Sequence, residues 1–220
     1  MTHIAMIPAR MGSQRLPKKN LAPLAGVPLI VHAIRKCLNT GLFDEVWVNS
    51  EHPDFGPIAE AEGAKFHQRP EQLGDNNATS EQFITEFLKA HDCTVLYQVH
   101  SIAPLLTQAD LTAFVEEMRK DECDALMSVV DENLECVFKG EPVNFTFAEK
   151  TNSQDLVPIQ RIVWAATAWR RETFLAAAEA GQCATYSGRV GYFPVGRMAG
   201  HVIKTQEDLD VATALYPILG

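Results

Sequence analysis

The sequence predicts an α/β fold in which helices cover both faces of a mainly parallel central sheet, giving three layers (α/β/α). The first observation is an alternation of short apolar runs with segments whose apolar residues recur at helical spacing. The second is length and composition: 220 residues, 46% of them hydrophobic, can bury the core of a single domain over residues 1–220. The third is the position of helix-start signals, which separate the apolar runs.

Strands are expected where short apolar runs are bounded by turn or polar residues. In chain order these runs are 4–7, 45–49, 65–67, 93–98, 125–130, 162–169 and 189–195. In a parallel sheet of this kind, ligands lie at the carboxyl ends of the strands. The residues that follow the strands, among them the loop after Ile7, Arg69 and the turn after Gln98, should therefore share one rim.

Helices are expected between these runs, over 28–40, 57–62, 79–88, 107–118, 171–180 and 205–216. Three of them have a recognisable start, because Thr79 is followed by Gln82 in a capping box, Thr107 precedes an amphipathic run, and Thr205 is followed by Asp208. Gly41 is placed to end the first helix.

A loop dense in positive charge follows the first strand. Four cations occur within ten residues: Arg10, Arg15, Lys18 and Lys19. The small residues Gly12 and Ser13 lie between them and can donate hydrogen bonds. No acidic residue precedes Asp44, although the formal net charge of the chain is -9. Backbone N–H groups and Arg or Lys side chains both favour phosphate oxygens, so this loop predicts a triphosphate site. Neither common phosphate-loop motif, G-x-x-x-x-G-K-[ST] or G-x-G-x-x-G, is present there.

Composition excludes several classes of partner. A sequence pI near 5.2 argues against general binding of nucleic acid, which needs a basic face. The five cysteines are odd in number and form no C-x-x-C pair, which is typical of reduced thiols in the cytoplasm. The sequence has no signal-peptide layout and no apolar run of about 18 residues, so we expect a cytoplasmic protein without a membrane partner.

The basic loop carries a longer pattern. Residues 7–20 read I-P-A-R-M-G-S-Q-R-L-P-K-K-N, which resembles the signature I-P-A-R-x-G-S-x-R-x-x-x-K-N of the acylneuraminate cytidylyltransferase family, the CMP-sialic acid synthetases and their relatives. Similar stretches lie at 154–161, 169–174 and 205–209. The resemblance implies a Rossmann-like nucleotidyltransferase fold and transfer of CMP from CTP to an acidic sugar, with release of pyrophosphate.

The resemblance also implies roles for single residues. Arg10, Gly12, Ser13 and Lys19 would hold the triphosphate, and Arg10, Arg15 and Lys19 would neutralise the charge that develops during transfer. Asn20, Arg69 and Ser80 would seat the cytidine and ribose. The acceptor sugar would face Gln98, Gln160 and Trp164.

The chain departs from the family at the positions that bind metal and acceptor. The family usually has two Mg²⁺-binding aspartates before T-x-E-D-L, and this chain has Val202 and Lys204 there. A usual Arg is replaced by Leu106, the sugar-facing N-G by Val163-Trp164, and the preceding Tyr by Gln160. The acceptor is therefore expected to be a 2-ulosonic acid other than ordinary sialic acid.

Two interpretations of the missing aspartates stay open. In one, Lys204 supplies positive charge and any Mg²⁺ is held by the nucleotide alone. In the other, the chain is a nucleotide-binding homologue that has lost catalysis. His100 and His201 lie near the altered positions and could form a replacement metal or acid–base pair, or simply bond at the surface. Trp164 could form an apolar wall for an unusual substrate, or fill core or dimer surface.

Residues 131–160 interrupt the alternation, with three phenylalanines among polar residues: Phe138, Phe145 and Phe147. In the resembling family this region projects and packs into a partner subunit. An excursion on a monomer would show the same pattern; we favour a homodimer.

Overall fold

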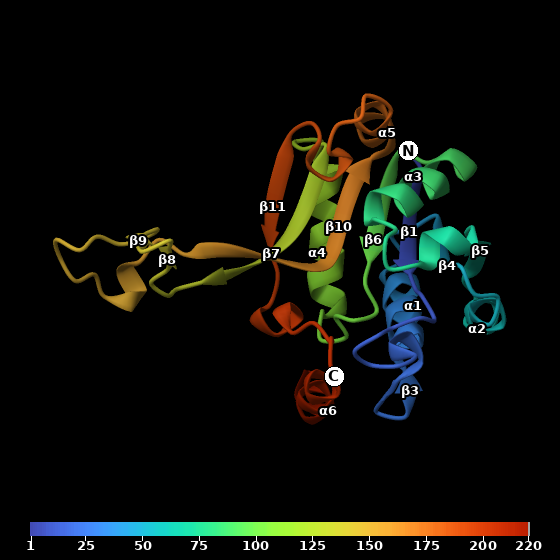
Figure 1. Ribbon diagram of the computed structural model, residues 1–220, viewed down its shortest axis with the longest axis horizontal. Coiled ribbons are helices and arrows are strands. Elements are labelled where there is room, and N and C mark those ends of the chain that lie inside the picture. Colours follow the sequence, from blue (N-terminus) through green and yellow to red (C-terminus); the bar gives the residue numbers. More distant parts are fainter. Residues whose placement is uncertain (220) are drawn as a thin grey trace.

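Seven strands form one sheet in the computed structural model, which describes residues 1–219 (Figure 1). The strand order is β11-β7-β10-β6-β1-β4-β5. All neighbours are parallel except β10, which runs antiparallel to both β6 and β7. The strands are β1 (His3–Pro8), β4 (Glu45–Ser50), β5 (Lys65–Gln68), β6 (Val95–Val99), β7 (Ala125–Glu132), β10 (Ile159–Arg170) and β11 (Val190–Pro194). The predicted mainly parallel sheet is confirmed.

Helices pack on both faces of this sheet. The core under α1 (Leu29–Thr40), α2 (Phe55–Ala61) and α4 (Gln108–Arg119) includes Ile30, Phe55 and Phe114. The core under α3 (Ser80–Ala90) and α5 (Arg171–Glu179) includes Phe87 and Phe174. A last helix, α6 (Gln206–Leu219), packs on the segment after β1. The expected three-layer arrangement is therefore confirmed.

The helix-start signals form the contacts that the sequence predicts. The Thr79 hydroxyl accepts a hydrogen bond from the Gln82 backbone N–H, and Gln82 bonds back to the Thr79 N–H. Thr107 and Asp110 make the same reciprocal pair at α4. Gly41 ends α1 in the left-handed conformation, at φ 64°. The predicted start of α2 at Pro57 was wrong by two residues, because the helix begins at Phe55. Pro57 lies in the first turn of the helix, where its missing N–H is not needed.

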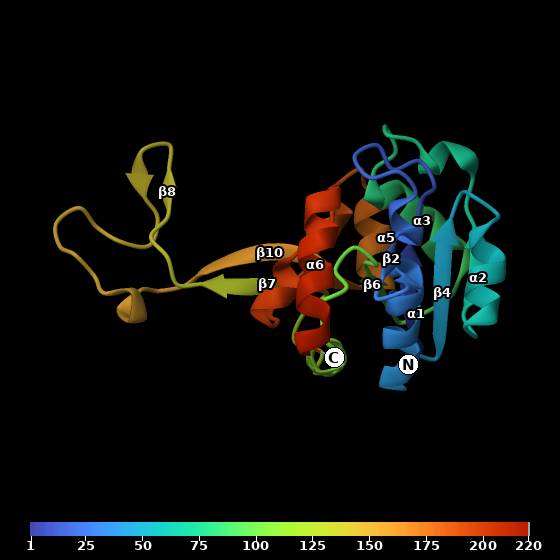
Figure 2. The ribbon, with the colours of Figure 1, turned by 90° about the horizontal axis from the view of Figure 1, so that it is seen from below.

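Residues 131–160 form an arm. β7 and β10 continue past the sheet as a two-stranded ribbon, in which Ile159 pairs with Glu132 and Gln160 with Asp131. The arm's tip carries β8 (Val137–Phe138) and β9 (Glu141–Pro142), and Figures 1 and 2 show it projecting away from the sheet and its helices.

The remaining elements are short. They are β2 (Pro23–Leu24), β3 (Val27–Pro28), η1 (Lys19–Leu21), η2 (Glu71–Gly74), η3 (Ser153–Asp155), η4 (Ala184–Tyr186) and η5 (Arg197–Gly200). All five cysteines are free, and Cys37, Cys93 and Cys123 are buried. No helix within residues 1–219 has the length and apolar character needed to cross a bilayer.

Candidate nucleotide site

The basic loop begins at the carboxyl rim of the sheet and is bonded to the neighbouring strand ends. The Ala9 N–H donates to the Asn49 carbonyl at the end of β4 (2.9 Å), and the Arg69 N–H donates to the Ser50 carbonyl (3.0 Å). The end of β6 is fixed by a bond from the His100 N–H to the Ala165 carbonyl (3.1 Å). The expected common rim is therefore formed by residues 9–20, 49–51, 69 and 98–101.

Asn20 fastens the far end of the basic loop to this rim. Its side chain is buried, its amide donates to the Arg10 carbonyl (2.9 Å), and its oxygen accepts from the Ser101 hydroxyl (2.8 Å). Asn20 thus ties the loop's start to its end and both to the turn after β6. Ser101 was not predicted, although its place just after a strand is the same signal that marked the other rim residues.

Arg69 lies under the loop with its guanidinium almost fully buried, at 4% exposure. It donates to the Asn49 side-chain oxygen (3.0 Å), the Ala9 carbonyl (2.9 Å) and the Glu51 carboxylate (3.0 Å). Its carbon lies 4.7 Å from the centre of the Phe83 ring. Burial lowers the pKa of Arg69, and Glu51 acts in the opposite direction. With these four partners, Arg69 links the ends of β1 and β4 beneath the loop.

Glu51 joins Arg69 to the first turn of the loop. One carboxylate oxygen pairs with Arg69, and the other accepts from the Met11 backbone N–H (2.8 Å). Sequence reasoning missed Glu51. Its position two residues after the expected strand 45–49 could have identified it as a rim residue, by the argument that identified Arg69.

The cations of the basic loop lack acidic partners among the residues that the structure describes. Within residues 1–219, neither Arg10, Arg15 nor Lys19 makes an ion pair, and Arg10 donates instead to the Asn76 side-chain oxygen (3.0 Å). Burial lowers the pKa of Lys19, and the charges of Arg15 and Arg10 lower it further. A Cβ on Gly12 would meet nothing within 4 Å, so the backbone there is open to a ligand. Unpaired charge of one sign, close enough to interact, favours a bound polyanion.

His100 and His201 do not form the acid–base or metal pair that the sequence left open. Burial, and then the charge of Lys19, lower the pKa of His100 to about 4, so it is neutral at neutral pH. The His201 ring bonds instead to the Asp208 carbonyl in α6 (2.7 Å).

Gln98 and Thr167 face each other across the antiparallel pair β6 and β10. Both are buried, at 2% and 0% exposure, and the Gln98 amide nitrogen and Thr167 hydroxyl have no hydrogen-bond partner within residues 1–219. Directly opposed residues point to the same side of a sheet. Their face is the one covered by α3 and α5, since Leu96 and Trp169, two residues away on each strand, belong to that core.

Trp164 lies at an irregularity in β10, where the pairing with β7 shifts between Ile162 and Thr167. Its φ is 53°, a strained value for a bulky residue, and 37% of its surface is exposed. Its ring lies 6.4 Å from that of Tyr186 in η4. The neighbouring Thr185 is bonded through its N–H and hydroxyl to Glu81 (2.7 Å each), which fixes η4 beside α3.

Ser80 and Gln160 lie further from the bonded rim. Ser80 is exposed at the first residue of α3, just after the loop whose Asn76 contacts Arg10. Gln160 is exposed on the arm ribbon and donates to Asp131 (3.3 Å). The structure thus places Gln160 with the arm, because β10 begins at Ile159 and its first residues pair with the end of β7 in the arm ribbon. Gln160 does not join Gln98 and Thr167.

A family model described as "Cytidylyltransferase" matches residues 4–215. The chain belongs to the cytidylyltransferase family. It is 37% identical to N-acylneuraminate cytidylyltransferase A of Danio rerio over 57% of this chain and 30% of the relative. It is 28% identical to pseudaminic acid cytidylyltransferase of Campylobacter jejuni serotype O:23/36, covering 99% of this chain and 97% of the relative. The chain spans about a third of the length of the N-acylneuraminate relatives from fish.

A solved structure described as CMP:2-keto-3-deoxy-manno-octonic acid synthetase complexed with CTP has a TM-score of 0.74 to this chain. It covers 99% of both chains at 18% sequence identity, and so shows the shared fold.

Proposed function

We propose that this chain transfers CMP from CTP to an acidic sugar of the 2-ulosonic type, other than ordinary sialic acid. The observation that carries the proposal is the unpaired cation cluster of Arg10, Arg15 and Lys19 at the carboxyl rim, within a cytidylyltransferase fold. Relatives named for N-acylneuraminate and pseudaminic acid support an acidic sugar as the acceptor.

In this reaction a hydroxyl oxygen of the acceptor forms a bond to the α-phosphorus of CTP. The bond from that phosphorus to the bridging oxygen breaks, pyrophosphate leaves with the electron pair, and the hydroxyl proton passes to water. Arg10 and Arg15 suit the forked oxygens of a phosphate, and Lys19 suits a point charge on the leaving group. Gly12 offers a backbone N–H group, whereas the Ser13 N–H donates within the loop to the Met11 carbonyl (3.0 Å). Asn20 and Arg69 fix the loop that carries them.

The acceptor would lie beyond the end of β6, over Gln98 and Thr167, with the aromatic face of Trp164 and Tyr186 beside it. The two buried polar atoms without partners supply hydrogen-bonding capacity there. Leu106 is 1% exposed and lies in the core, so it presents no charge to the acceptor's carboxylate. These features support an acceptor different from ordinary sialic acid, with an apolar part toward Trp164.

Any Mg²⁺ would reach this site on the phosphates of CTP, since such ions often bind through phosphates and retain several waters. The arm would pack into a second copy of the chain, giving a homodimer. Its exposed apolar side chains support this, among them Phe138 (66% exposed), Phe147 (73%) and Val157 (72%).

Pyrophosphate release from CTP, measured against a panel of 2-ulosonic acids, tests the activity. Release with at least one acid other than sialic acid is expected. Arg10→Ala and Lys19→Ala should each weaken CTP binding by about tenfold or more, because each removes a charged hydrogen bond. Lys89→Ala is the matched control, since Lys89 is exposed in the last turn of α3, outside the basic loop, and is expected to leave binding unchanged. Binding of CTP with no release on any acid would instead identify a catalytically silent homologue.

Sedimentation equilibrium tests the dimer. The double variant Phe138→Ser/Phe147→Ser should sediment as a monomer, whereas Val211→Ser, which changes an exposed apolar residue of α6, should not alter the mass. A monomeric parent protein would refute the dimer and leave the transferase proposal standing.

A further inference from the structure

Val202 and Lys204 stand where the resemblance implies two magnesium-binding aspartates. Within residues 1–219, no three His, Cys, Asp or Glu side chains lie together so as to hold a metal ion. The carboxylate of Asp208, one helical turn further on, is already used: it accepts from the backbone N–H groups of Lys204 and Thr205, both at 2.8 Å. The donor set of this chain therefore does not fit a protein-held Mg²⁺.

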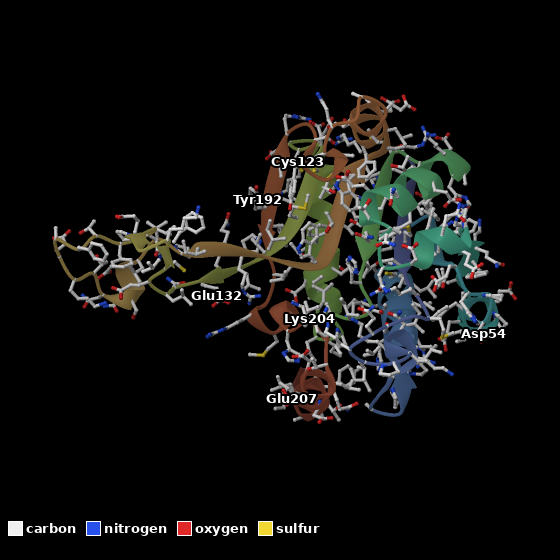
Figure 3. The ribbon with its side chains drawn as sticks, viewed as in Figure 1. Asp54, Cys123, Glu132, Tyr192, Lys204 and Glu207 are labelled. Carbon is white, nitrogen blue, oxygen red and sulfur yellow. The ribbon has the colours of Figure 1, made fainter. Side chains whose placement is uncertain are left out.

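The backbone holds Lys204 rigidly beside the basic loop. The Ile203 N–H donates to the Ile102 carbonyl (2.8 Å), in the turn whose Ser101 binds Asn20. The Ile203 side chain is fully buried and belongs to the same apolar cluster as Leu16, which lies within the basic loop. Figure 3 labels Lys204 just before α6, on the side of the sheet where β7 and β11 end.

The positive charge of Lys204 adds to the electrostatic potential that the loop cations create around Lys19. The pKa of Lys19 is lowered by burial, then by Arg15 and Arg10, and also by Lys204, with Asp208 opposing them. Lys204 is exposed and makes no ion pair within residues 1–219. Repulsion between cations this close together raises the free energy of the unliganded protein, and a bound anion relieves it. The cluster can therefore attract phosphate without a metal ion.

We propose that the ammonium group of Lys204 neutralises part of the charge of the triphosphate, a role that Mg²⁺ held by carboxylates would otherwise have. CTP would then bind without a divalent cation. The proposal rests on the proposed function of the site. In this proposal Lys204 contacts the nucleotide directly. The positive charge of its side chain replaces the positive charge of a Mg²⁺ ion that two aspartates would have held.

Isothermal titration calorimetry of CTP into the full chain, with Mg²⁺ or with EDTA, tests this directly. The parent protein should bind CTP in EDTA within about threefold of its affinity in Mg²⁺. Lys204→Met should lose about tenfold or more in EDTA, because it removes a charged contact to phosphate. In Mg²⁺ the loss should be smaller, since the nucleotide's own cation offsets part of the missing charge.

Two further variants make the result specific. Lys89→Met removes an exposed lysine in the last turn of α3, outside the basic loop, and should leave binding unchanged in both buffers. Val202→Asp/Lys204→Asp restores the family's acids and should convert the protein to one that binds CTP only with Mg²⁺. Thermal melts of each variant establish that it is folded before binding is compared.

Binding by the parent protein only in Mg²⁺ would overturn the proposal, and so would equal affinity of the parent and Lys204→Met in EDTA. Either result leaves the transferase function standing, because CTP still binds. An absence of CTP binding in both buffers would refute the proposed function itself, and this proposal with it.

Discussion

Replacing Glu51 by Gln tests whether the buried ion pair with Arg69 organises the rim. The Arg69 side chain is 3% exposed and that of Glu51 11%, so removing the carboxylate charge leaves a guanidinium buried without its counter-ion. Losing one partner of a buried pair costs about 3 kcal/mol of unfolding free energy. For a chain of 220 residues, that cost lowers the melting temperature by about 6 to 12 °C.

Urea denaturation of a double-mutant cycle measures the pair itself. Glu51→Gln, Arg69→Met and the double variant are compared, and the double variant should be more stable than the summed single effects predict, by about 2 kcal/mol. Glu62→Gln is the matched control, because it removes a carboxylate from an exposed pair with Arg35, which contributes little. The reasoning fails if the cycle shows no coupling, or if Glu51→Gln is as mild as Glu62→Gln.

Three further predictions concern single positions. The pKa of His100 is about 4 in the folded protein, against 6.5 ordinarily. As the pH falls, the unfolded chain is therefore protonated at His100 before the folded chain. The contribution of neutral His100 to the free energy of unfolding is fully present above pH 6.5 and is lost, by up to about 3 kcal/mol, toward pH 4. Urea midpoints of His100→Gln across that range should fall less steeply than the parent's. Trp164→Gly should change unfolding free energy by less than about 1 kcal/mol, because relief of the left-handed strain offsets lost packing, while KM for the acceptor rises; an unchanged KM would remove Trp164 from the acceptor site. Thr107→Ala should cost about 1 kcal/mol in urea denaturation through loss of the α4 cap, and Thr112→Ala, inside the same helix, provides the comparison.

The sequence was enough to predict which strands and helices follow one another along the chain, the caps at Thr79 and Thr107, and the position of the basic loop after β1. These features are local: apolar periodicity, capping residues and a concentration of like charge act over a few residues and need no knowledge of distant contacts. The rim residues Asn20 and Arg69 could also be expected, because parallel strands bring their carboxyl ends to one edge.

The pairings between distant segments could be seen only in the folded structure. The direction of β10 brings Thr167 opposite Gln98, while its extension carries Gln160 out onto the arm. The fold also joins Glu51 to Arg69, and Trp164 to Tyr186. The physical reason is that strand direction and order follow from burying the whole set of apolar faces at once, and no single stretch of sequence contains that information.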